Sequence, residues 1–241
     1  MTREADSTVG WRLLLFGASG AIGDAVRTEA IERGWSVTAV SRAPRADTAD
    51  TTWRSYDALR DDGSVFVGDR PFDAVCWAHG ANMTDSVRGF DPARHVDLYR
   101  ANCLSIICAM AMLVEHDLLR TLGARLVLVS SIWQERARAD KMSYTVTKAA
   151  VGGLVRSASV DLGRDGHLVN GVLPGVLDTP MTRANLSAEQ IETVTSKTTL
   201  GRLPDLATLA STICFLASLE NTSISGQSIT VDLGMSNAIL L

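Results

Sequence analysis

The sequence of 241 residues has few of the side chains that build disulfide frameworks or metal sites. It contains four cysteines and four histidines, with no Cys-x-x-Cys pair and no histidine spacing that suits a metal ion. Each cysteine stands in an apolar stretch, so we interpret all four as buried, reduced side chains and expect no metal site. Only six prolines are present, and there is no repeat, low-complexity block or linker. These absences exclude a disulfide-stabilised miniprotein, a disordered chain and a repeat protein.

The sequence also lacks an excess of positive charge and a long apolar run. Asp plus Glu number 27 against 23 Lys plus Arg, a net charge of −4, so nucleic acid is not an expected partner. The longest apolar run, 101–114, is interrupted by Asn102 and Ser105 and is too short to span a bilayer. Residues 1–10 have no apolar core like that of a signal peptide. We therefore expect a cytoplasmic protein with no membrane partner.

Short apolar runs alternate with longer segments of helical periodicity along the chain. Apolar residues make up 46% of it, enough for one large domain. The expected strands are 12–16, 36–40, 52–56, 73–78, 125–130, 168–173 and 228–232. The first expected helix follows the segment 17–23 and runs to about residue 33. The others are 92–119, 143–162, a short one opened by a capping box at Ser187 and Gln190, and 204–217. This alternation predicts a Rossmann-like, doubly wound α/β fold, with seven mostly parallel strands and helices on both faces. We expect one domain over 1–241, with a flexible segment at 1–10.

A glycine-rich turn lies between the first strand and the helix that follows it. It consists of Gly17-Ala18-Ser19-Gly20-Ala21-Ile22-Gly23. Glycines in such a turn let the backbone approach a pyrophosphate, and the helix N-terminus supplies free N–H groups and the positive end of its dipole. Glycine-rich turns are common, but the place of this one after the first strand indicates a dinucleotide site.

The end of the second strand bears on which dinucleotide binds. Sites that prefer NAD carry Asp or Glu here for the ribose 2′-hydroxyl, whereas this chain has Ser41 followed by Arg42. A guanidinium can pair with a 2′-phosphate through two charge-assisted hydrogen bonds. We therefore predict NADP(H) as the preferred cofactor and NAD(H) as the alternative, in which case Arg42 is an ordinary solvated charge.

Tyr144 and Lys148 lie four residues apart near the start of a predicted helix and so share one helix face. A free tyrosine has a pKa of about 10, and a nearby ammonium favours the phenolate, which would make Tyr144 a usable acid or base. Ser131 ends the strand before this helix, where its hydroxyl could hold a substrate carbonyl oxygen beside the phenol. The spacing alone is common, and Ser131 is what makes it indicative of a catalytic site.

Together with further motifs, these residues resemble the short-chain dehydrogenase/reductase family, of the compact single-domain kind. The resemblance covers about 12–234. Its motifs, in matching order, are the glycine turn, Asn102 in the long helix, Ser131, Tyr144-x-x-x-Lys148, Pro174-Gly175 with Thr179, and Gly226-Gln227 followed by Val231-Asp232-Leu233-Gly234.

The resemblance implies a role for each matching residue. Tyr144 would protonate the carbonyl oxygen, Lys148 would lower the pKa of Tyr144 and bind the nicotinamide ribose, and Ser131 would orient the substrate. Ser131 is preferred to Ser130 because it lies 13 residues before the tyrosine, as in the family. Asn102 would hold a water that links Lys148 to a proton relay. The cofactor would lie against Gly17, Ser19, Gly20, Ala21, Ile22, Gly23, Ser41, Arg42, Asp57, Ala78, Gly80, Tyr144, Lys148, Pro174, Gly175 and Thr179.

The chain departs from the family pattern in three places. Ala21 stands where a glycine is usual, and the resulting glycine spacing is more typical of the longer, epimerase-type relatives; we expect cofactor binding to survive this. The family's Asn-Asn-Ala-Gly segment is Trp77-Ala78-His79-Gly80, so His79 marks either a repacked loop or an imidazole that reads the substrate. The terminal Asp-Gly-Gly is Asp232-Leu233-Gly234, which we interpret as a packing change.

The segment between Ser131 and Tyr144 would border the substrate pocket of such an enzyme, with Trp133 and Gln134 as candidate substrate contacts. Its basic residues would attract an anionic substrate, or belong to a solvated loop or subunit contact; they are Arg136, Arg138 and Lys141. The region 178–200 matches the family's mobile lid, which would place Leu177 and Met181 against the substrate.

We predict an NADPH-dependent oxidoreductase that reduces a small-molecule carbonyl to an alcohol, or the reverse, with Tyr144 as the acid/base. The alternatives are a non-catalytic dinucleotide-binding sensor or partner protein and, ranked below it, an epimerase or dehydratase. An enoyl-reducing relative is disfavoured because such enzymes usually space tyrosine and lysine farther apart. An apolar stripe on the helix around 103–114 and the apolar segment 238–241 predict a homodimer or homotetramer.

Overall fold

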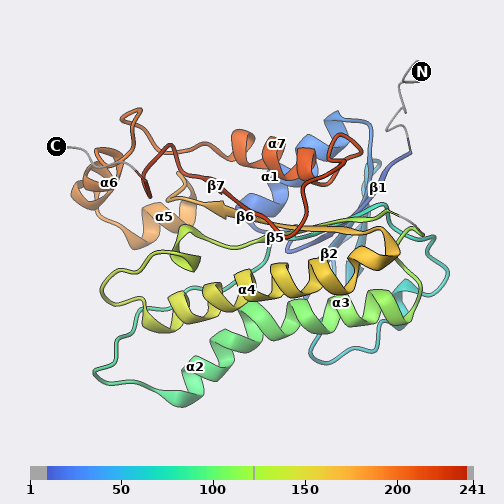
Figure 1. Ribbon diagram of the computed structural model, residues 1–241, viewed down its shortest axis with the longest axis horizontal. Coiled ribbons are helices and arrows are strands. Elements are labelled where there is room, and N and C mark those ends of the chain that lie inside the picture. The colour runs from blue at the N-terminus through green and yellow to red at the C-terminus, as the bar shows by residue number, and fades with distance from the viewer. Residues whose placement is uncertain (1–9, 122, 238–241) are drawn as a thin grey trace.

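The computed structural model describes residues 10–121 and 123–237, and it confirms the predicted fold class. Its seven strands form one parallel sheet in the order β3-β2-β1-β4-β5-β6-β7, covered by helices on both faces (Figure 1). The strands are β1 Arg12–Phe16, β2 Ser36–Ser41, β3 Thr51–Ser55, β4 Ala74–Trp77, β5 Arg125–Val129, β6 Leu168–Pro174 and β7 Ser228–Val231. Of the expected flexible segment 1–10, all but Gly10 lies outside the described residues, as does the apolar segment 238–241.

The α-helices agree with the predicted ones in place and differ in three details. They are α1 Ala21–Glu32, α2 Pro92–Tyr99, α3 Ser105–Glu115, α4 Met142–Asp161, α5 Pro180–Asn185, α6 Ala188–Thr195 and α7 Leu206–Leu216. The single helix expected over 92–119 is divided by a π-helical turn at Arg100–Leu104 and stops at Glu115. It stops there because Asp117 takes a positive φ of 52° and Leu119 pairs with Phe72. The short helix α5 was not expected at all.

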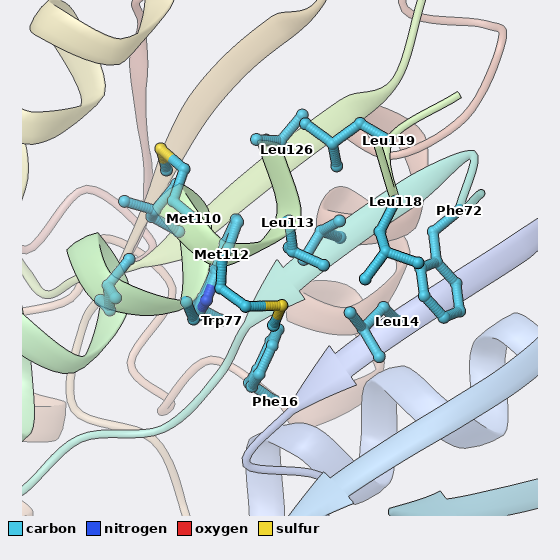
Figure 2. Close-up of a cluster of buried hydrophobic side chains, with 14 of the residues drawn as sticks. Leu14, Phe16, Phe72, Trp77, Met110, Met112, Leu113, Leu118, Leu119 and Leu126 are labelled. Atoms are coloured by element: carbon cyan, nitrogen blue, oxygen red, sulfur yellow. The ribbon is translucent and has the colours of Figure 1, made fainter. Parts of the chain in front are cut away.

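Two apolar clusters fill the two faces of the sheet. One lies under α3 and α4 and joins strand residues such as Leu14 and Phe16 to Met110, Met112 and Leu113 of α3 (Figure 2). The other lies under α1 and α7, which pack side by side above the sheet in Figure 1. The segment Pro92–Glu115 is long and apolar enough to satisfy a length and hydropathy test for a membrane span. Its buried face is part of the core, as expected of a central helix in a sheet protein.

The strand order creates a switch point between β1 and β4. The chain goes from β1 outward to β2 and β3 on one side, and then returns to β4 on the other side of β1. All strands are parallel, so their carboxyl ends lie along one edge of the sheet. Ligands of doubly wound folds bind at this edge, beside the switch point. The glycine turn, Ser131 and Pro174-Gly175 lie at or just after the carboxyl ends of their strands, whereas Gly226-Gln227 lies before β7 at the opposite edge.

Two glycines of the turn after β1 are required by close backbone contacts. Gly17 has a φ of +76°, and a Cβ there would come within 2.6 Å of the His79 amide nitrogen. A Cβ on Gly23 would meet the Gly17 carbonyl oxygen at 2.2 Å, whereas one on Gly20 would keep 3.6 Å from it. Ala21 is the first residue of α1 and is exposed, so its methyl group fits without displacing anything.

We predict that Gly23→Ala destabilises the protein and that Gly20→Ala does not. The new methyl group at Gly23 has to displace the backbone of the turn, which costs about 1–3 kcal/mol in the free energy of unfolding. At Gly20, where φ is −88°, the methyl group meets only an ordinary contact. Urea unfolding of both variants measures the difference, and equal unfolding midpoints would contradict it.

Candidate active site

Tyr144 and Lys148 lie one turn apart near the start of α4, beside the carboxyl end of β5. The Lys148 ammonium is 5.7 Å from the centre of the Tyr144 ring. Lys148 is only 4% exposed, and its Nζ donates a hydrogen bond to the Val129 carbonyl oxygen at 3.3 Å. The end of β5 therefore holds the ammonium, and the ammonium lies against the phenol ring.

Ser131 follows β5 and meets the same phenol. Its hydroxyl is near enough to the Tyr144 phenol to lower the pKa of that group by hydrogen bonding, and it accepts the Trp133 N–H at 3.3 Å. Ser130 points elsewhere, because its hydroxyl donates to the Lys148 carbonyl oxygen at 3.5 Å. Of the two serines, the geometry thus favours Ser131 as the partner of Tyr144.

Burial dominates the titration of this pair. It raises the pKa of Tyr144 above its ordinary value, and the hydrogen bond from Ser131 offsets only part of that rise. It also lowers the pKa of Lys148 to about 8. The sequence predicted that the neighbouring ammonium lowers the pKa of Tyr144, and the structure without ligand does not show this. Loss of solvent disfavours both the Tyr144 phenolate and the Lys148 ammonium.

Asn102 lies in the π-helical turn between α2 and α3, close to Lys148. Its side-chain amide donates to the Ala81 carbonyl oxygen at 3.0 Å and to Thr147 Oγ1 at 3.1 Å, and its Oδ1 accepts the Ala81 N–H at 2.6 Å. A Cβ on Gly80 would come within 3.3 Å of Asn102 Oδ1 and 3.4 Å of Lys148 Nζ. The π turn therefore brings the Asn102 side chain and the Lys148 ammonium to the same side of Gly80. Such turns are frequent at functional sites.

On the other side of the switch point, the glycine turn presents an uncapped helix N-terminus. Gly20 is the N-cap of α1, and no side chain caps it. The first amides of a helix have no partner within it, so they remain available to an anion such as a phosphate. With the two glycines that allow close backbone approach, this arrangement fits the pyrophosphate of a dinucleotide.

The residues around this turn also suit the adenosine half of a dinucleotide. Ser41 ends β2 and Arg42 follows it, exposed to solvent. Asp57, after β3, accepts the Leu59 N–H at 3.1 Å, and Ala78 and Gly80 follow β4. A hollow of about 600 Å³ opens beside the turn, bordered by Ser19, Gly20, Arg27, Arg45 and Trp53 among others.

Sequence reasoning missed Arg45 and Trp53 in this region. The Arg45 guanidinium stands 5.0 Å from the centre of the Trp53 ring, on the wall of the hollow. The signal was present, because Arg42 and Arg45 belong to one short loop at the carboxyl end of β2. What the sequence did not show is that β3 places an aromatic ring under the second arginine.

The end of β6 supplies the remaining cofactor candidates. Gly175 follows Pro174 and donates its N–H to the Val231 carbonyl oxygen at 3.0 Å. A Cβ on Gly175 would come within 2.8 Å of Asp232 Cβ, so the close approach of the chain after β7 requires glycine there. The Thr179 hydroxyl accepts the Thr182 N–H at 3.2 Å and caps α5.

The four candidate substrate residues lie in different surroundings. Trp133 is partly exposed, with the Arg138 guanidinium 6.0 Å from its ring centre. Gln134 packs on Gly152 and donates to the Ser228 hydroxyl at 3.0 Å. Leu177 is buried in the cluster under α1 and α7. The side chain of Met181 lies outside the described part of the structure.

His79 is bonded to the protein rather than turned toward Ser131 and Tyr144. Its Nε2 lies 2.9 Å from the Ser105 hydroxyl, which in turn donates to the Ala101 carbonyl oxygen. The ring packs edge-on against Phe16, and burial lowers its pKa to about 4. Of the two readings left open, these contacts favour a repacked loop.

Comparisons with known proteins show which family the whole chain resembles. A family model described as Enoyl-(Acyl carrier protein) reductase matches residues 74–236. The chain is 28% identical to the 3-oxoacyl-[acyl-carrier-protein] reductase of Vibrio harveyi over 235 residues, covering 92% of this chain and 96% of that protein. It is 28% identical to the gluconate 5-dehydrogenase of Gluconobacter oxydans, covering 79% and 75%.

A solved structure shows the same fold. The gluconate 5-dehydrogenase of Burkholderia cenocepacia, in complex with NADP and tartrate, superposes with a TM-score of 0.88 at 22% identity, covering 95% of this chain and 96% of that one. The family model covers well over half of the chain, and the curated relatives are named reductases and dehydrogenases acting on C=O and CH–OH groups. The chain therefore belongs to the short-chain dehydrogenase/reductase family and is an oxidoreductase.

Proposed function

We propose that this protein is an NADPH-dependent reductase of a small-molecule ketone or aldehyde, or the corresponding alcohol dehydrogenase. The observation that carries the proposal is the meeting of the Tyr144 phenol, the Ser131 hydroxyl and the buried Lys148 ammonium at the end of β5. Nothing in the packing of these three groups needs all of them to be polar, whereas proton transfer to a carbonyl oxygen does.

In the direction of reduction, Tyr144 donates its phenolic proton to the carbonyl oxygen of the substrate. A bound nicotinamide nucleotide would supply the hydride that the carbonyl carbon receives. The Ser131 hydroxyl donates a hydrogen bond to the same oxygen and so fixes it beside the phenol. A raised pKa keeps Tyr144 protonated before the reaction. As the proton leaves, the Lys148 ammonium favours the phenolate electrostatically.

The phenolate has to regain a proton before the next turnover. Lys148, whose pKa is lowered to about 8, can pass one on at neutral pH. We propose that a water held near Asn102 reprotonates Lys148. This is supported by the close approach of Asn102 Oδ1 and Lys148 Nζ to Gly80.

The preference for NADPH rests on the arginines around the adenosine side. Arg42 follows β2, and Arg27 and Arg45 border the hollow beside the glycine turn. No carboxylate stands at position 41 or 42 to bind a ribose 2′-hydroxyl. Solved relatives of the same fold are titled with bound NADP.

The names of the relatives indicate the general substrate class, a compound with a carbonyl or hydroxyl group. Their names include reductases of 3-oxoacyl carriers and dehydrogenases of gluconate and rhamnose. We propose a small carbonyl compound that enters between Trp133 and the segment 178–200, which contains α5 and α6 and acts as the lid. A non-catalytic sensor is less well supported, because a sensor has no use for an acid positioned against a second hydroxyl.

We also propose a cytoplasmic homodimer or homotetramer. Apolar side chains stand exposed on α3 and α4, which lie together on one face of the sheet (Figure 1). They are Ile107, Val114, Val146 and Val160. A second copy of the chain would remove them from water.

Replacing the proposed acid tests the mechanism. We expect Tyr144→Phe to lower kcat by about 100-fold or more, because the carbonyl oxygen loses its proton donor, while the affinity for NADPH stays the same. Turnover on a carbonyl substrate found by screening measures this. Tyr99→Phe, on α2, is the control and should retain full activity. Full activity in Tyr144→Phe would refute the mechanism.

Calorimetric titration with NADPH and NADH tests the cofactor preference. We expect wild-type protein to bind NADPH more tightly, and Arg42→Ala to weaken NADPH binding about tenfold or more, because a charge-assisted pair with the 2′-phosphate is lost. NADH binding should not change. Arg164→Ala removes an exposed arginine outside the site and serves as the control. Equal losses for both nucleotides would argue against Arg42 as the 2′-phosphate ligand.

Light scattering at micromolar protein tests the assembly. We expect two or four times the chain mass of 25.8 kDa. Val114→Glu should shift the assembly toward the single chain by placing a charge in the contact. Val67→Glu, at a more exposed apolar position off α3 and α4, should not. A wild-type mass of one chain would contradict the proposal.

A further inference from the structure

The helix that carries Tyr144 and Lys148 begins without a cap of its own. Three other helices are capped by the side chain of their own N-cap residue: Asp91 caps α2, Ser187 caps α6 and Asp205 caps α7. At α4 the N-cap residue is Lys141, whose side chain caps nothing. The first amides of α4 therefore need partners from elsewhere in the fold.

Asp85 supplies those partners from the loop that follows β4. Its main-chain carbonyl oxygen accepts the Met142 N–H at 3.3 Å, and its carboxylate accepts the Ser143 N–H at 2.9 Å. The second carboxylate oxygen accepts the Ser143 hydroxyl proton. One residue, more than 50 positions away in the sequence, thus satisfies the first two amides of the helix and places a negative charge at its positive end.

His95 of α2 completes this contact. Its Nδ1 lies 2.7 Å from the Ser143 hydroxyl oxygen. Because the Ser143 hydroxyl donates its hydrogen bond to Asp85, its oxygen is the acceptor from His95. Asp85, His95 and Ser143 therefore resemble a hydrolytic triad in composition but not in arrangement. Ser143 is fully buried, and its proton goes to the carboxylate rather than to the imidazole. The cluster is a structural connection, not a nucleophile.

The loop that carries Asp85 is itself fixed at several points. Ala81 is bonded through both its main-chain groups to the Asn102 side chain, which also reaches Thr147 on α4. Farther along, the Lys141 ammonium donates to Asn82 Oδ1 at 2.8 Å, to the Met83 carbonyl oxygen at 3.1 Å and to the Thr84 hydroxyl at 3.3 Å. The loop is therefore tied both to the π turn and to the first turn of α4.

We infer that Asp85 is a positioning residue for the proposed acid: by capping α4 from the loop after β4, it holds Tyr144 in line with Ser131. Tyr144 directly follows the capped residue Ser143, and Ser131 comes from a different element. The distance between their oxygens therefore depends on the first turn of α4 staying wound. Helix ends without a cap fray. The inference rests on the proposed function, since it assigns Asp85 a part in that reaction.

The experiment compares Asp85→Ala with a matched loss of another helix cap. Asp205→Ala removes the carboxylate that accepts the Thr208 N–H at the start of α7, away from Tyr144. Both variants should show a similar fall in the urea midpoint. Hydrogen exchange at the amides of 142–145, measured without ligand, should become faster in Asp85→Ala and stay unchanged in Asp205→Ala.

Kinetics then separate positioning from stability. We expect kcat to fall roughly ten- to a hundredfold in Asp85→Ala, because the phenol is displaced, with the KM for NADPH within about twofold of wild type. Asp85→Asn keeps one acceptor for the Ser143 N–H, so its kcat should lie between those of Asp85→Ala and the wild type. Asp205→Ala should keep the wild-type kcat. If Asp85→Ala fails to fold, the Asn variant carries the test.

Two results would overturn the inference. One is unchanged exchange at 142–145 in Asp85→Ala or Asp85→Asn. The other is faster exchange with a wild-type kcat, which would make Asp85 a stability residue only. Failure of the proposed function is seen separately, as wild-type protein that binds a dinucleotide and reduces no carbonyl, or that binds neither nucleotide.

Discussion

The burial of the Lys148 ammonium against the end of β5 is the interaction on which the site depends. Removing an ammonium from water is costly unless polar partners replace the solvent. Here the Val129 carbonyl oxygen accepts from Nζ, and Ser130 donates back to the Lys148 carbonyl oxygen. These two bonds join α4 to the strand end, so the ammonium that lies against the Tyr144 ring also helps to fix how far the helix stands from Ser131.

The surrounding loops are held by side chains that reach across the fold rather than by their own turns. Asn102 connects the loop after β4 to α4, and Asp85 caps the start of α4. At the end of β4, Trp77 stacks on Phe16 with the ring centres 5.6 Å apart. The chain around the end of β4 is therefore held by the Phe16–Trp77 pair and by the contact of His79 with Ser105.

Several parts of the site could be predicted because local chemistry specifies them. The glycine turn needs small residues at Gly17 and Gly23 for backbone contacts, and the spacing of Tyr144 and Lys148 follows from helix geometry. Other parts could not be predicted. The contacts of Gln134 with Gly152 and the Ser228 hydroxyl, for example, join segments that are far apart in the sequence. The rise in the Tyr144 pKa depends on burial, which spacing does not reveal.

The sequence by itself determined the alternation of strands and helices, the place of the glycine turn and the shared helix face of Tyr144 and Lys148, because each depends on periodicity or short spacing. Only the tertiary structure decided which side chains complete the site. The cap of α4 by Asp85, the stacking of Arg45 on Trp53 and the π turn at Asn102 join segments that are far apart in the chain or depend on its packing. Such contacts leave no local pattern, since they form only when the parallel strands bring their carboxyl ends to one edge.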